Sequence, residues 1–83
     1  MISPFYKSPT NVLKVHIFKT NIESNLDVDM IQLLFSSNRS IIKWSVDLED
    51  IDRVLRIESN KTLSDNDIIS QLKLIGFSCE ELE

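Results

Sequence analysis

The chain has 83 residues, of which 42% are hydrophobic and 27% are charged, and its formal net charge is −4. This length forms one domain, and the balance of apolar and charged residues is that of a folded globular protein rather than a disordered one. An acidic chain lacks the dense positive charge that releases counterions from a phosphate backbone. We therefore expect no nucleic-acid partner.

The single cysteine, Cys79, excludes a disulfide within the chain and suits the reducing cytoplasm. No apolar run approaches the roughly 20 residues that a transmembrane helix requires. The first residues also lack the charged lead and apolar stretch of a secretory signal peptide. We therefore expect a cytoplasmic protein without a membrane partner.

The first part of the chain divides into a short lead and a predicted strand. Residues 1–11 contain both prolines and are predicted to form an extended N-terminal segment, followed by one domain over residues 12–83. Within residues 12–19, Leu13, Val15 and Ile17 alternate with Lys14 and His16, which is the periodicity of a strand. This pattern places His16 on the polar, solvated face. The phenylalanine that follows breaks the alternation and indicates either a bulge or an aromatic residue on the second face.

Residues 25–37 predict a helix, which Ser24 or Asn25 can cap. Its apolar residues form two stripes, whereas a helix that lies on a sheet needs only one. One stripe comprises Val28, Ile31, Leu34 and Phe35. The second comprises Leu26, Met30 and Leu33, at positions i, i+4 and i+7. This second stripe is either a further buried face or an exposed patch that meets a partner, and the sequence leaves both open.

The middle of the chain predicts a hairpin. Residues 41–48 alternate regularly, with Ile42, Trp44, Val46 and Leu48 on the apolar side. A polar turn follows at residues 49–50, and residues 52–58 return as a second strand.

The last third predicts a helix and a short strand. Ser64 with Asp67 is a capping box, which opens a helix whose apolar face comprises Ile68, Ile69, Leu72 and Ile75. The only glycine, Gly76, suits the left-handed position that ends a helix. Residues 77–82 then form a short strand or extended end. The order strand, helix, strand, strand, helix, strand predicts an α+β domain of ferredoxin-like βαββαβ fold, with two helices on one face of a four-stranded antiparallel sheet.

Residues 41–50, 53–57 and 64–82, with the glycine–aromatic pair Gly76-Phe77, resemble the heavy-metal-associated domains of copper chaperones and copper pumps. The resemblance covers roughly residues 12–82. Its metal motif, Met-x-Cys-x-x-Cys, falls on Ile22, Ser24 and Asp27, and residues 20–40 contain neither cysteine nor histidine. Because soft metals prefer thiolate or imidazole ligands, the resemblance implies a degenerate member that binds no such metal.

Other candidate sites are weak. Cys79 is predicted to be a small buried hydrophobe, with a thiol pKa raised by Glu80 and Glu81. A metal pair of Cys79 with His16 would lack further ligands. The acidic residues of the hairpin, which are Asp47, Glu49, Asp50 and Asp52, lack the central glycine and distant glutamate of a calcium loop.

With one histidine and one cysteine, the chain signals no nucleophile–base pair, so we expect no enzyme, catalytic residue, metal or cofactor. The favoured function is a non-catalytic protein-interaction module, which binds another protein or itself through a sheet edge or through the helix, with Leu26, Met30 and Leu33 as the candidate contacts. The alternatives are a small metal-handling protein with an atypical site, and a domain that binds a regulatory small molecule. Fold analogy alone does not decide among these functions.

Overall fold

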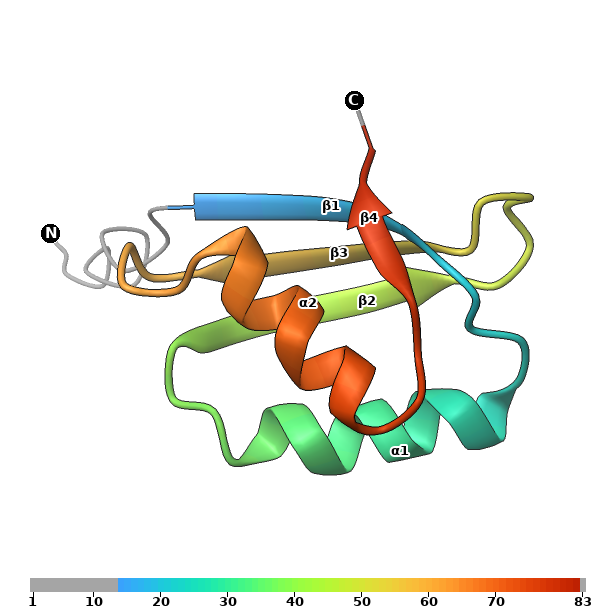
Figure 1. Ribbon diagram of the computed structural model, residues 1–83, viewed down its shortest axis with the longest axis horizontal. Coiled ribbons are helices and arrows are strands. Elements are labelled where there is room, and N and C mark those ends of the chain that lie inside the picture. Colours follow the sequence, from blue (N-terminus) through green and yellow to red (C-terminus); the bar gives the residue numbers. More distant parts are fainter. Residues whose placement is uncertain (1–13, 83) are drawn as a thin grey trace, which may run out of the picture.

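The computed structural model describes residues 14–82. Its elements, in chain order, are β1 (Lys14–Thr20), α1 (Asn25–Ser36), β2 (Ile41–Asp47), β3 (Val54–Ser59), α2 (Asp65–Leu74) and β4 (Cys79–Glu81) (Figure 1). The strands form one antiparallel sheet in the order β2-β3-β1-β4. This is the ferredoxin-like α+β fold, as the sequence predicted. The predicted N-terminal segment, residues 1–11, and Leu13 lie outside the described residues.

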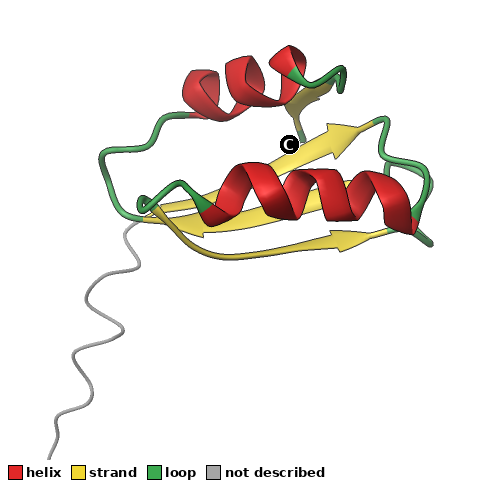
Figure 2. Ribbon diagram, turned by 90° about the horizontal axis from the view of Figure 1, so that it is seen from below, coloured by secondary structure: helices red, strands yellow, loops and turns green. Residues whose placement is uncertain are grey.

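Both helices pack on the same face of the sheet. Viewed from below, α1 lies in front of the strands with α2 beside it (Figure 2). One core cluster joins strand residues to helix residues, and its members are Phe18, Ile22, Ile31, Phe35, Leu55, Ile57, Leu63, Ile68, Leu72 and Phe77. Burying a large apolar side chain contributes about 1.5–3 kcal/mol, so this single cluster is the main source of stability.

The phase of β1 is opposite to the one predicted from its alternation. His16 and Phe18 face the helices with exposed fractions of 4% and 0%, whereas Val15 and Ile17 are 49% and 40% exposed on the open face. The placement of His16 on a solvated face was therefore wrong. The aromatic ring decides the phase, because Phe18 has more apolar surface to bury than either Val15 or Ile17.

A bulge in β2 changes the predicted face of one residue. The pairing of β2 with β3 shifts its register between Ile41 and Lys43. The extra residue re-aims the start of the strand. Ile41, Trp44 and Val46 therefore pack against the core, while Ile42 is 45% exposed, contrary to the predicted alternation.

The helix ends follow the sequence signals closely. The Ser24 hydroxyl accepts a hydrogen bond from the Asp27 backbone N–H at the start of α1, and Ser64 and Asp67 form a complete capping box at the start of α2. After α2, the N–H groups of Gly76 and Phe77 donate to the carbonyls of Lys73 and Leu72, at 3.1 and 3.0 Å. This pair of bonds is a Schellman motif, which requires the left-handed φ of 94° that Gly76 adopts.

In residues 14–82, neither helix has the length and apolar character needed to cross a membrane.

Substituting Gly76→Ala tests the role of this left-handed position. A Cβ at Gly76 would meet no atom within 4 Å, so the cost is conformational strain rather than a clash. We expect a loss of about 1–2 kcal/mol in the free energy of unfolding, measured by urea denaturation. The control is Leu74→Ala, because Leu74 is 86% exposed and its truncation should change stability by less than about 0.5 kcal/mol. Equal losses in the two variants would contradict this assignment.

Candidate functional site

The positions that align with the metal motif form a helix start instead. Ile22 is fully buried in the core. The Ser24 hydroxyl caps α1, and the Asp27 carboxylate accepts a 2.9 Å hydrogen bond from the Glu23 backbone N–H. The polar side chains of this loop are therefore engaged with backbone donors at the positive end of the helix dipole.

An arginine holds the same loop from across the fold. Arg53 donates through Nη1 to the carbonyl oxygens of Ile22 and Glu23, each at 3.3 Å. Its own backbone has a φ of 48°, which is unusual for a residue with a side chain. The Thr20 hydroxyl donates to the Arg53 carbonyl at 2.6 Å and fixes that turn. No local pattern in the sequence indicates this role, because Arg53 lies about 30 residues from the carbonyls that it binds.

His16 is the centre of a polar chain that sequence reasoning missed, in which His16 and Ser59 are buried and Asp65 is partly exposed. Its Nδ1 lies 2.5 Å from the Asp65 carboxylate, and its Nε2 lies 2.8 Å from the Ser59 hydroxyl. The Ser59 hydroxyl also lies 2.9 Å from the Asn60 carbonyl, to which it donates. Three elements, β1, β3 and the first turn of α2, are joined by these bonds. A buried imidazole with both nitrogens bonded avoids the cost of an unpaired polar group.

The order Ser59–His16–Asp65 is that of a nucleophile, a base and an orienting carboxylate. A nucleophile must be reached by its substrate, yet the Ser59 side chain is completely buried. Its hydroxyl is also bonded to a backbone carbonyl. In this conformation the three residues form a structural bridge between β1, β3 and α2.

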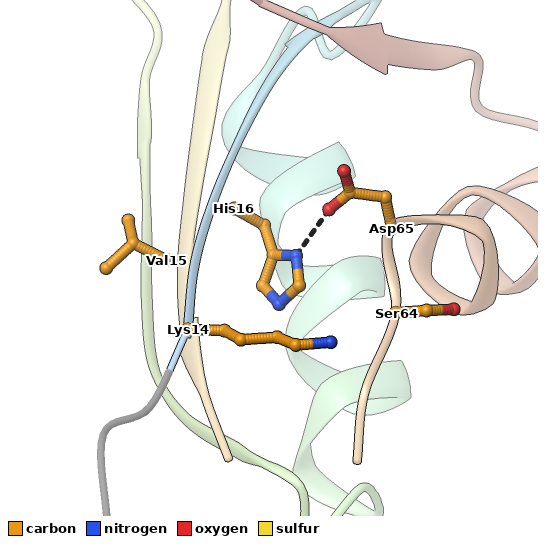
Figure 3. Close-up of a pocket in the computed structure, with 5 residues that line it drawn as sticks. All are labelled: Lys14, Val15, His16, Ser64 and Asp65. Carbon is orange, nitrogen blue, oxygen red and sulfur yellow. Dashed lines mark hydrogen bonds and ion pairs between the residues drawn. The ribbon is translucent and has the colours of Figure 1, made fainter. Parts of the chain in front are cut away.

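A cavity of about 440 Å³ lies between β1 and the start of α2, lined by Lys14, Val15, His16, Ser64 and Asp65. Figure 3 shows the side chains of Lys14, His16 and Asp65 directed into the space between the two elements, with Val15 on the other side of the strand. Lys14 Nζ donates to the Leu63 carbonyl at 3.0 Å. The Lys14 ammonium group and the His16 imidazole, which both lie at this cavity, are thus each bonded to another group of the protein.

The electrostatics of this region follow from the same bonds. The hydrogen bond from His16 holds the pKa of Asp65 below its usual range, against an opposing effect of burial, and a hydrogen bond with Glu81 lowers it further. Burial raises the pKa of the Cys79 thiol to about 11, and the Asp65 carboxylate contributes to the increase. The expected direction of the Cys79 pKa is therefore confirmed, but the cause is burial and Asp65 rather than Glu80 and Glu81.

The structure does not bring His16 and Cys79 together. Although β1 and β4 are neighbours, Cys79 pairs with Thr20. Thr20 lies four positions beyond His16, which is about 13 Å along a strand. In residues 14–82, no three side chains of the histidine, cysteine, aspartate or glutamate type are grouped so that they could hold a metal ion.

The acidic residues of the β2–β3 turn bind backbone instead of converging. The Asp47 carboxylate accepts from the Glu49 N–H at 3.0 Å, and the Asp50 carboxylate accepts from the Asp52 N–H at 2.8 Å. Aspartate side chains commonly stabilise turns in this way. Asp52 also lies 3.9 Å from Lys19 Nζ.

The second apolar stripe of α1 is exposed. Leu26, Met30 and Leu33 have exposed fractions of 75%, 46% and 77%. The stripe with Ile31 and Phe35 fills the core instead. Beside the exposed stripe, a cavity of about 400 Å³ is lined by Met30, Leu33, Leu34, Ser37 and Ile75. The two predicted alternatives were a further buried face and an exposed patch. Within residues 14–82 the stripe is uncovered, as in the second alternative.

Comparison with known proteins adds no relative. No protein-family model matches the chain, and no curated protein is significantly similar to it in sequence. The βαββαβ order and the sheet order β2-β3-β1-β4 are compatible with a heavy-metal-associated domain.

Substituting His16→Ala tests the buried bridge. The variant leaves a cavity and removes the ring partner of Ser59 and Asp65, so we expect a loss of about 2–4 kcal/mol in the free energy of unfolding. Lys19→Ala, on the open face of the same strand, should cost less than about 0.5 kcal/mol. Urea denaturation at neutral pH measures both. If His16→Ala costs no more than Lys19→Ala, the bridge does not stabilise the fold.

The lowered pKa of Asp65 predicts a specific loss of stability in acid. Its folded-state pKa lies below the ordinary value of 3.8, so its contribution is complete above pH 3.8 and is lost as pH falls through the folded-state pKa. We expect the difference in unfolding free energy between wild type and Asp65→Asn to be largest near pH 6 and to shrink below about pH 4. Asp29→Asn, on the exposed side of α1, controls for the loss of one charge. A difference that does not change with pH would contradict this interpretation.

Proposed function

We propose that the protein is a non-catalytic interaction module that binds a protein partner through α1. The observation that carries this proposal is the exposure of Leu26, Met30 and Leu33 on a helix whose opposite side already fills the core. Three large apolar side chains in one row are not required to hold this helix on the sheet. Contiguous exposed apolar surface of this kind is typical of a binding site.

The neighbouring cavity supports the same surface. Its lining includes Leu34 from α1 and Ile75 from the end of α2, so the stripe borders a depression between the two helices. An apolar ridge beside a depression offers shape as well as area to a partner. The unbranched side chain of Met30 adapts readily to such contacts.

We further propose that the domain is a degenerate heavy-metal-associated domain acting in the cytoplasm. The support is the compatible fold and the loop at residues 22–27, where Ser24 and Asp27 bond to backbone at the positions that align with the metal motif. A hydroxyl and a single carboxylate are poor ligands for a soft metal. The loop is also fixed by Arg53, so a metal is not needed to order it.

The double variant Met30→Lys, Leu33→Lys tests the interaction surface. Both side chains project from the exposed side of α1, so we expect the melting temperature to change little and a partner recovered with the tagged wild-type chain to be lost. Ile51→Lys is the matched control, because Ile51 is an exposed apolar residue, at 93%, in the β2–β3 turn. Unfolding of the double variant would show that the stripe belongs to the core. Equal loss of the partner in the Ile51→Lys control would show that the surface is elsewhere.

A further inference from the structure

We propose that the partner of the exposed stripe is a second copy of this chain, docked antiparallel along α1 about a two-fold axis near Met30. The inference rests on the proposed function and names its partner. We call the stripe formed by Leu26, Met30 and Leu33 the seam.

The spacing of the seam suits a helix-to-helix contact. Positions i, i+4 and i+7 repeat the alternating steps of four and three residues that form the apolar seam of a coiled coil. Leu26 and Leu33 are about 10 Å apart along the helix axis, with Met30 between them. A two-fold contact buries the same patch on both copies, and therefore requires a patch that is complementary to itself.

The seam meets this requirement. Its outer leucines are equally exposed, at 75% and 77%, on either side of the smaller exposure of Met30, at 46%. A two-fold axis near Met30 would place Leu26 of each copy beside Leu33 of the other. The depression lined by Leu33, Leu34 and Ile75 would then receive the partner's Leu26. Each copy supplies one projecting leucine and one depression, so both halves of the contact are filled.

Charge favours the antiparallel direction. The acidic residues Glu23, Asp27 and Asp29 lie at the start of α1, and no charged residue follows in the helix. The next charge is that of Arg39, which is exposed in the turn beyond the helix. A parallel pair would set the acidic starts side by side, where like charges repel. An antiparallel pair sets each acidic start beside the uncharged end and Arg39 of the other copy, and also opposes the two helix dipoles.

The oligomeric state of the full chain tests the proposal. We expect sedimentation equilibrium, from micromolar to millimolar concentrations, to show a monomer–dimer equilibrium. Leu26→Lys should raise the dissociation constant by at least about tenfold, because it introduces two charges into the depressions. Ile51→Lys, which adds the same charge outside the seam, should leave the constant unchanged.

A cysteine cross-link tests the direction and the axis. In a Cys79→Ser background, Met30→Cys should form a disulfide-linked dimer under mild oxidation, since the two substituted positions face each other across the axis. Gln32→Cys, which is exposed on the same helix but off the seam, is the control and should remain monomeric.

Two results would overturn the proposal. One is a chain that stays monomeric up to millimolar concentration. This result would exclude the second copy, and would leave residues 1–13 or a different protein as the occupant of the seam. The other is a dimer that Leu26→Lys leaves intact. If the chain is monomeric while the Met30→Lys, Leu33→Lys variant loses a different partner, the interaction module stands and only the second copy is excluded.

Discussion

The inward position of His16 is the constraint on which the arrangement of this small domain depends. Burying Phe18 fixes the phase of β1, and this phase places the imidazole of His16 among apolar side chains. A buried imidazole needs polar partners, which are supplied by Ser59 at the end of β3 and Asp65 at the start of α2. The bridge therefore fixes where α2 begins relative to the sheet, at the edge where β4 is short.

Local signals in the sequence were sufficient to predict most of the helices and strands and their order. The capping box of Ser64 and Asp67, the glycine at residue 76 and the periodicity of both helices act within a few residues, so they can be read without knowing the tertiary structure. The order of elements then leaves few topologies for the sheet. The resemblance to heavy-metal-associated domains supplied the strand order, which the periodicity of the chain does not contain.

The features that were missed all depend on residues far apart in the sequence. The alternation in β1 is compatible with either face, and only the partner at Asp65, 49 residues away, shows why a histidine can be buried there. The bulge that exposes Ile42 depends on the register with β3. The bonds of Arg53 to the loop after β1 likewise cross the fold. In each case, tertiary contacts select one conformation from several that the local sequence allows equally well.

The loop before α1 links the positions that align with the metal motif to the proposed binding surface. Its carbonyls are held by Arg53, and Asn21 exchanges hydrogen bonds with Ser78 in the loop before β4. The start of α1 is thus fixed by the chain's own side chains. A surface on a helix that is already fixed at its start loses little conformational freedom when a partner binds, so more of the apolar burial at Met30 and Leu33 remains as affinity. A loop without soft-metal ligands and an apolar surface on the helix that follows it are therefore consistent with one another.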